Sequence, residues 1–456
     1  MPVFWEASYM LRDQWDKSLD AGMSDPTAFK DEKAAKMYRP APTNAAAARR
    51  GSVAAKPGVA LEVMSWLSRA TLDIIGQAGF GFNFASLDPH ASQTKLGTVF
   101  STLFNHGAAK MTAHTLLVRT MMERTLAVLP IEQIIAGPRI KAARKTFKSM
   151  DDESRKIVEG KRQEVLADAG KPKDLISLLI KATLRDAKMH LTDTELQGQM
   201  TTFILAGHET TSTYLSWTLW RLALNPKVQD KLREEVRAAR RAALDKGHEE
   251  MTVDELNAMH YMDCVLREVG RLDPPVPMSQ RTAQVDDVVP LGTPVKSPVD
   301  GKMRSSVNIK AGTQIIIAIA AYNRSREHFG QDADEFRPER WDELGNRAAG
   351  DGHASCGVWS PLMTFLAGAR ACIGFRFALL ELKTCVHLLL SHRLLPLAHT
   401  LAQDPRRLAR ALRLRSQGRS DAGRAPRRRR PAPRHLWRGG ARLPPASHRH
   451  ARAHGR

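Results

Sequence analysis

One cysteine, Cys372, stands between a glycine-containing turn and a helical pattern in the stretch FLAGARACIGFRFALLELK (365–383). A helix N-terminus favours negative charge, so a thiol placed there, two residues after Arg370, is expected to ionise readily. A thiolate serves as a nucleophile or as a metal ligand. Zinc would need further Cys or His ligands at suitable spacing, and a Cys–His hydrolase would need a histidine better placed than His387 or His392. Iron in a porphyrin needs only one protein ligand, and a thiolate can supply it.

The longest expected helix, 192–223, carries small and polar residues in its middle, in the stretch LAGHETTSTY. Ala206 and Gly207 are small, and a glycine inside a helix costs stability unless something must approach the backbone. Threonine hydroxyls can bond carbonyls three or four residues back and loosen the helix there. With Glu209 and Thr210 beside it, such a groove suits proton delivery to a small ligand. The alternative is a contact between helices through the small residues, and the sequence leaves both open.

Three charged residues further along the chain are candidates for a structural ion-pair cluster. Glu268 and Arg271, in LREVGRLDPPVP, are three residues apart and therefore share one helical face. Most such pairs lie on the surface and contribute little, but a rigid proline-rich exit follows this one, where it can be buried. A buried pair needs further hydrogen-bond partners, and the stretch FRPERW offers a second guanidinium in Arg340.

The elements that carry these residues are mostly helical. Capping boxes at Thr192–Glu195 and Thr252–Glu255 mark the starts of the long helix and of a short one. Between 276 and 320, the stretches VVPLGTPV, SSVNIKAGTQ and IIIAIAA are typical of short strands joined by turns, and 322–364 is expected to be irregular. The predicted fold class is therefore mainly α with a minor β-sheet (α+β). Apolar residues recur at helical spacing over 1–20, 60–78, 95–128, 138–168, 173–186, 192–223, 260–272 and from Cys372 to about residue 390.

Taken together and in this order, the motifs resemble those of the cytochrome P450 monooxygenases. FLAGARACIG matches the heme loop Phe-x-x-Gly-x-Arg-x-Cys-x-Gly of that family, and EVGR matches its Glu-x-x-Arg pair. AGHETT matches its oxygen-activation motif, and FRPERW its Pro-Glu-Arg segment. The resemblance covers about residues 1–392 and is similar in character to fungal microsomal members. It implies the cytochrome P450 fold, which we expect to be incomplete at both ends.

The resemblance also implies roles for individual residues around a heme b cofactor. It makes Cys372 the proximal ligand of the heme iron. It assigns contacts with the heme propionates to Arg370 and Arg281, and packing near the thiolate, which tunes it, to Phe365. Gly368 and Gly374 belong to the same heme-binding loop. It assigns proton delivery to Thr210 and Glu209, with Ala206 and Gly207 leaving room for oxygen. The structural ion-pair cluster on the proximal side would consist of Glu268, Arg271 and Arg340.

The activity implied by the resemblance is insertion of one oxygen atom from O₂ into a small apolar organic substrate. Electrons would come from an NADPH-cytochrome P450 reductase. Microsomal members lie at the cytosolic face of the endoplasmic reticulum membrane. This sequence contains no run of about 18 uncharged apolar residues, so a soluble cytosolic location is the other expectation.

The end of the chain differs in composition from the rest. Residues 401–456 hold 17 arginines, no lysine and two acids, and so carry most of the net charge of +21. We therefore predict a partial catalytic domain over 1–392 and a disordered Arg/Pro-rich tail over 393–456. The tail is an arginine-rich arm for RNA or membranes, or the out-of-frame translation of a GC-rich gene; we favour the latter and expect no nucleic-acid partner. The alternative function is a non-catalytic remnant that holds no heme and has a basic tail able to bind nucleic acid.

Overall fold

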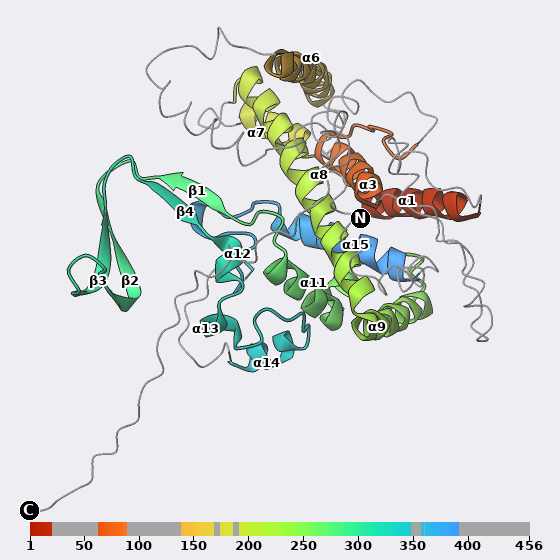
Figure 1. The fold of residues 1–456 in the computed structure, drawn as a ribbon. Helices are drawn as coiled ribbons and strands as arrows, with labels where there is room; N and C mark the ends of the chain where they lie inside the picture. Colours follow the sequence, from red (N-terminus) through yellow and green to blue (C-terminus); the bar gives the residue numbers. More distant parts are fainter. Residues whose placement is uncertain are drawn as a thin grey trace, which may run out of the picture. The chain divides into compact units, whose positions relative to one another are not determined.

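A computed structural model describes residues 1–20, 63–88, 138–167, 174–185, 191–347, 357–359 and 361–391 (Figure 1). The chain divides into two compact units, Met1–Ser416 and Gln417–Arg456, and every described residue lies in the first. The predicted helix over 95–128 and the predicted tail over 393–456 lie outside the described residues.

Helices dominate the described part of the chain, and four short strands accompany them (Figure 1). The strands are β1 Ser279–Thr282, β2 Asp287–Lys296, β3 Met303–Ile309 and β4 Gln314–Ile317. The helices are α1 Pro2–Asp20, α3 Val63–Phe80, α6 Pro138–Leu166, α7 Leu175–Arg185, α8 Asp193–Leu224, α9 Pro226–Asp245, α10 Val253–Asn257, α11 His260–Leu272, α12 Ile319–Tyr322, α13 Arg326–Phe329, α14 Arg340–Arg347 and α15 Phe375–Ser391. The predicted α+β class, with helix predominating, is confirmed.

The long helix α8 is the element against which most other helices pack. It begins as predicted, because the Thr192 hydroxyl accepts the Glu195 N–H at 3.3 Å and the Glu195 carboxylate accepts the Thr192 N–H at 2.8 Å. Those two bonds satisfy backbone donors that a helix start otherwise leaves free. Helix α8 contacts α3, α6, α7, α9, α11 and α15, so its residues meet neighbours on several faces.

The buried apolar residues form two clusters along α8. The larger cluster joins α1, α3, α8, α9, α11 and α15, with Trp5, Leu67, Leu215, Val265 and Leu389 among its members. The second cluster joins α3, α6, α7 and α8, and its members include Phe80, Phe84, Ile176, Ile180 and Met200. Phe377, at the start of α15, packs against both clusters. The helix that follows Cys372 is therefore anchored in the whole helical core.

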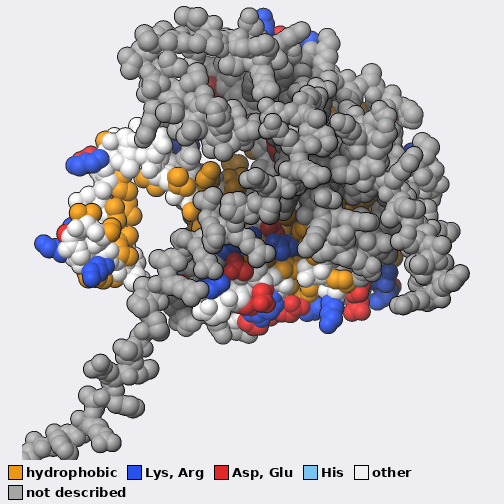
Figure 2. All heavy atoms as spheres, in the orientation of Figure 1, with side chains coloured by type: hydrophobic (Ala, Val, Ile, Leu, Met, Phe, Trp, Pro, Cys, Tyr) orange, Lys and Arg blue, Asp and Glu red, His pale blue; other side chains and the backbone are white. Residues whose placement is uncertain are grey.

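The β structure differs from the single minor sheet that the sequence predicts. Strands β1 and β4 form one antiparallel pair, in which Ser279 lies opposite Ile317, and β2 and β3 form a separate antiparallel hairpin. The hairpin exposes apolar side chains that Figure 2 shows along it. They are Val288, Val289, Val295, Met303 and Val307.

Other differences concern the ends of elements. The stretch IIIAIAA is a strand only as far as Ile317, and the residues from Ile319 onward form helix α12. Ala320 donates its N–H to the Pro277 carbonyl at 2.9 Å, and alanine favours helix over strand. The region expected to be irregular contains α13 and α14, and α9 was not predicted. Its signal was present, since Pro226 occupies the first turn and apolar residues recur every four positions after it.

Candidate functional site

The loop before α15 holds Cys372 in a defined backbone conformation. The Cys372 N–H donates to the Phe365 carbonyl at 2.8 Å, and the Ala371 N–H donates to the Gly368 carbonyl at 3.0 Å. Gly368 adopts φ +65°, in the left-handed region that suits glycine. These bonds fold residues 365–372 back on themselves. The sulfur consequently lies just before the first turn of α15.

Aromatic rings support this loop from within the protein. The Phe365 ring lies 5.5 Å from the Trp359 ring and 6.1 Å from the Phe375 ring, measured between centroids. The Arg267 guanidinium of α11 stacks over Trp359 at 4.7 Å. Phe365 is half-buried in this group, so its side chain ties the loop to α11 and to α15.

The Cys372 thiol itself is exposed, as are its neighbours Arg370 and Ile373, the latter by 92%. Desolvation by the surrounding protein raises the pKa of Cys372, and a hydrogen bond from the Gly374 N–H lowers it to a smaller extent. Contrary to the expectation from the sequence, the helix N-terminus alone therefore does not ionise this thiol. A cation bound at the sulfur would be needed to favour the thiolate.

The structure brings the three predicted cluster residues together. Arg271 and Glu268 are completely buried, and the Arg271 guanidinium donates twice to the Glu268 carboxylate, at 2.9 and 2.7 Å. Arg340 reaches the same carboxylate at 3.4 Å and donates to Asp332 at 2.7 Å. Those bonds to Arg340 lower the pKa of Asp332 to about 2. The group links α11 to the segment before α14.

The cluster also contains two residues that the sequence did not indicate. Asp332 is one of them, and Asn323 is the other. The Asn323 carbonyl accepts from Arg271 at 3.1 Å, and its side-chain amide donates to the Thr364 hydroxyl at 3.0 Å. A buried chain of hydrogen bonds thus runs from the ion pair to the residue immediately before Phe365. The Asn323 partners Arg271 and Thr364 lie 52 and 41 residues away in sequence, so no local pattern predicts these contacts. The Asp332 partner Arg340 is only eight residues away.

Within α8, the predicted oxygen-side residues lie on two different faces. A Cβ at Gly207 would come within 2.9 Å of Ile75 of α3, so this glycine permits a close approach of the two helices. The alternative reading, a contact between helices, therefore holds for Gly207. Ala206 and Glu209 are exposed, and Thr210, half-buried, shares their face.

Thr210 and Glu209 are the polar side chains on that face. The Thr210 hydroxyl donates to the Ala206 carbonyl at 2.6 Å, as expected for threonine in a helix. The helix stays continuous through this point. Partial burial raises the pKa of Glu209 above its usual range, which favours the protonated carboxyl. The face therefore presents hydroxyl lone pairs beside a carboxyl group that holds its proton more tightly.

Arg281 lies in β1, where its guanidinium donates to the Ser279 hydroxyl at 2.8 Å and to the Gln280 carbonyl at 2.7 Å. Within the part of the chain that the structure describes, no hydrogen bond or ion pair joins Arg281 or Thr210 to the Cys372 loop. The structure therefore brings together Phe365, Gly368, Arg370, Cys372 and Gly374 in one loop, and Glu268, Arg271 and Arg340 in one cluster.

Comparison with known proteins bears on what this arrangement is for. The family model described as Cytochrome P450 matches residues 44–406 of the chain. The chain belongs to the cytochrome P450 family. Cytochrome P450 proteins are heme-dependent monooxygenases, and the loop around Cys372 matches the residues and spacing of the heme-loop motif.

Individual relatives agree with this assignment. Cytochrome P450 monooxygenase 205 of Postia placenta is 36% identical over 337 residues, which cover 72% of this chain and 58% of that protein. Cytochrome P450 monooxygenase claQ of Ampulloclitocybe clavipes is 32% identical and covers 85% and 63%, respectively. Ganoderic acid synthetase CYP5150L8 of Ganoderma lucidum is 34% identical and covers 72% and 61%. The chain thus spans about three fifths of the length of these relatives.

A solved structure shows the same fold. The crystal structure of a cytochrome P450, CYP102L1, superimposes with a TM-score of 0.53 at 22% sequence identity, over 73% of this chain and 62% of that one. The predicted cytochrome P450 fold is confirmed. None of the described helices combines the length and the apolar composition needed to cross a bilayer.

The described residues fit a heme held through Cys372. The thiol is exposed, and the adjacent Ile373 is almost fully exposed, which suits contact with a flat apolar ring. The exposed Arg370 guanidinium suits a carboxylate at the edge of that ring. Iron bound at the sulfur would favour the thiolate over the thiol.

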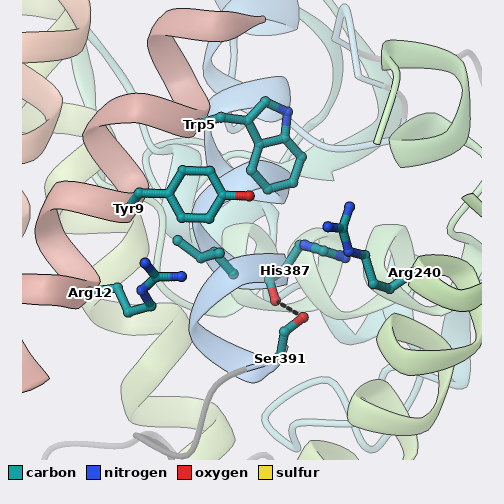
Figure 3. Close-up of a pocket in the computed structure, with 7 residues that line it drawn as sticks. Trp5, Tyr9, Arg12, Arg240, His387 and Ser391 are labelled. Carbon is teal, nitrogen blue, oxygen red and sulfur yellow. Dashed lines mark hydrogen bonds between the residues drawn. The ribbon is translucent and has the colours of Figure 1, made fainter. Parts of the chain in front are cut away.

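A separate hollow of about 200 Å³ lies between α1, α9 and α15 (Figure 3). Trp5 and His387 meet edge to face there, with ring centroids 5.4 Å apart, and the Ser391 hydroxyl donates to the His387 carbonyl at 2.7 Å. Burial, with a contribution from Arg240, lowers the pKa of His387 to about 4. None of the predicted site residues lines this hollow, so it is not part of the heme loop.

Proposed function

We propose that this chain is the catalytic part of a heme-thiolate monooxygenase that inserts one oxygen atom from O₂ into a small apolar organic substrate. The second oxygen atom leaves as water, and the two electrons come from NADPH through a cytochrome P450 reductase. The observation that carries the proposal is the exposed Cys372 thiol in a complete heme loop. Bound heme b would supply the activation of O₂.

On the proximal side, the chain's own residues would bind and orient the heme. Cys372 holds the iron through its sulfur, and the Gly374 N–H donates to that sulfur and moderates its charge. Arg370 pairs with a propionate. Phe365 holds the loop in place beside the sulfur through its contacts with Trp359 and Phe375.

On the α8 side, Glu209 and Thr210 would take part in proton delivery. The Thr210 hydroxyl proton is engaged by the Ala206 carbonyl, so its oxygen can accept a hydrogen bond from water. Partial burial raises the pKa of Glu209, so this carboxyl group holds its proton to a higher pH than a free glutamate does. The two groups lie on one helical face, where Glu209 can supply a proton and the Thr210 oxygen can hold a water molecule.

Substrate and location are also part of the proposal. One relative is named a ganoderic acid synthetase, which supports an organic metabolite as the class of substrate. A microsomal reductase as partner would put the reaction at the cytosolic face of the endoplasmic reticulum membrane, and the microsomal character of the motifs supports this location.

The test is the carbon monoxide difference spectrum of the reduced, heme-loaded chain. We expect the red-shifted Soret band of thiolate ligation, its loss in Cys372→Ser, and its retention in the control Cys385→Ala, because Cys385 is buried in the core. Circular dichroism establishes that each variant is folded. A folded parent chain that takes up heme without the thiolate band, or a band that survives Cys372→Ser, would overturn the proposal.

A further inference from the structure

Three side chains of different chemistry converge where α11 meets α14, away from the Cys372 loop. His260 begins α11, Cys264 lies one turn later on the same face, and Asp342 comes from the first turn of α14. The His260 Nε2 atom lies 2.5 Å from Asp342 Oδ1 and 3.6 Å from Cys264 Sγ. The Cys264 sulfur lies 4.0 Å from Asp342 Oδ1.

The separations suit a tetrahedral cation. Ligand atoms bound to one zinc ion at about 2.0–2.3 Å lie roughly 3.3–3.8 Å apart. The two distances from the sulfur already fall within a few tenths of an ångström of that range. The short contact between His260 and Asp342 is a hydrogen bond between exposed side chains, with 71% and 50% of their surfaces accessible. Both can rotate outward to admit an ion.

We propose that His260, Cys264 and Asp342 form a zinc site that cross-links α11 to α14. An imidazole nitrogen, a thiolate sulfur and a carboxylate oxygen are the donor types that zinc takes in proteins. Three protein ligands leave the fourth position for water. The site is independent of the heme, since none of its ligands belongs to the heme loop.

The surrounding charges favour a cation at this position. Besides Asp342, the carboxylates of Asp263 and Glu235 act on Cys264, and Arg267 opposes them. Lys383 pairs with Asp263 at 2.7 Å. Together with burial, these acids raise the pKa of the Cys264 thiol to about 12. Zinc binding would displace the thiol proton, forming one sulfur–zinc bond and releasing one H⁺. Affinity should therefore rise with pH.

The location gives the ion a structural consequence. Helix α14 also carries Arg340, and α11 carries Glu268 and Arg271, so zinc would join the same two elements that the buried ion pairs join. A ligand that binds only the folded chain stabilises it in proportion to its concentration. Zinc should consequently raise the melting temperature by an amount that grows with its concentration.

The test uses the full chain carrying Cys372→Ser, so that the heme-loop thiol cannot bind the probe. After treatment with chelator, Co²⁺ is titrated in, followed by competing Zn²⁺. We expect a thiolate-to-cobalt absorption band with a one-to-one endpoint, lost on adding Zn²⁺. Replacing Cys264 by Ser should abolish that band, and His260→Ala or Asp342→Asn should weaken binding by more than the roughly 10- to 100-fold that loss of an outer partner costs.

The matched control is His248→Ala, because His248 also pairs with a carboxylate, that of Glu255, but has no cysteine in that pair. It should leave both the cobalt band and the zinc-induced rise in melting temperature unchanged. The proposal is wrong if the folded chain shows no thiolate-to-cobalt band. It is equally wrong if the band survives Cys264→Ser, or if His248→Ala removes it while His260→Ala does not.

Discussion

At the scale of single residues, Arg271 is the best-satisfied charge in the described core. Besides two bonds to Glu268, its guanidinium donates to the carbonyls of Asn323, Ala333 and Glu335. A buried pair is costly to desolvate, and it persists because every donor has an acceptor. Its removal would leave Glu268 with a single ion-pair contact, to Arg340 at 3.4 Å.

Arg271→Met should therefore lower the free energy of unfolding by about 3–5 kcal/mol, the range for a buried charge left without its partner. Arg304→Met is the matched control, because Arg304 pairs with Asp300 on the exposed hairpin and should cost less than about 1 kcal/mol. Urea unfolding followed by circular dichroism measures both. Equal losses of unfolding free energy in the two variants would show that the buried pair stabilises the fold no more than the exposed pair does.

The sequence predicted Glu268, Arg271 and Arg340 as members of this cluster, but not Asp332 or Asn323. Spacing alone placed Glu268 and Arg271 on one helical face, and a second motif offered Arg340. Asn323 was missed because its partner Arg271 lies 52 residues away in sequence. Asp332 was missed although Arg340 is only eight residues away. The ionisation of Cys372 was also misjudged, since desolvation outweighs the single backbone N–H that favours the thiolate.

At the scale of elements, the packing of α8 depends on how closely α3 can approach it. A Cβ at Gly207 would lie 2.9 Å from Ile75, whereas a Cβ at Gly198, in the same helix, would meet nothing within 4 Å. Both glycines carry the same intrinsic cost in a helix, about 1 kcal/mol relative to alanine. The two positions therefore separate helix propensity from packing.

Gly198→Ala should raise the free energy of unfolding by about 0.5–1 kcal/mol. Gly207→Ala should lower it by about 1–3 kcal/mol, because the added methyl forces Ile75 out of its packed position. Combining Gly207→Ala with Ile75→Val should lose less than the sum of the two single changes. A Gly207→Ala variant as stable as Gly198→Ala would remove the packing role.

Local signals predicted most of the helices. The two capping boxes marked the starts of α8 and α10, and the apolar spacing placed α11. The β region was harder to predict, because isoleucine-rich and alanine-rich residues adjoin in IIIAIAA. In the structure the Ala320 N–H bonds to the Pro277 carbonyl just past the end of the strand. The sequence could not decide the role of Gly207 either, because that role depends on which helix lies opposite.

At the scale of the whole molecule, the helical core buries titratable groups that respond to pH in opposite directions. His208 on α8 and His387 on α15 each have a pKa lowered to about 4 by burial. Glu381, also on α15 and 1% exposed, has a pKa raised well above its usual value. The motifs in the sequence indicated none of these three, because burial follows from how six helices assemble.

The signs follow from which state binds the proton more tightly. Below about pH 6.5 the unfolded chain protonates its histidines while the folded core keeps them neutral, so their contribution to stability is lost as the pH falls toward 4. Glu381 acts in reverse, since above about pH 4.5 the unfolded chain ionises this carboxyl and the folded core does not. The two effects partly cancel in the parent protein, so variants are needed to separate them.

His387→Phe should keep the edge-to-face contact with Trp5 and extend into the adjoining hollow (Figure 3). Both ring nitrogens of His387 lack partners among the described residues, so the change removes no hydrogen bond of that ring. Relative to the parent, this variant should gain about 2 kcal/mol more at pH 5 than at pH 7.5. Glu381→Gln should do the opposite, gaining more at pH 7.5, because the amide cannot ionise. Urea unfolding at the two pH values measures each difference, and a gain from His387→Phe that does not depend on pH would mean that this histidine titrates alike in the folded and unfolded chain.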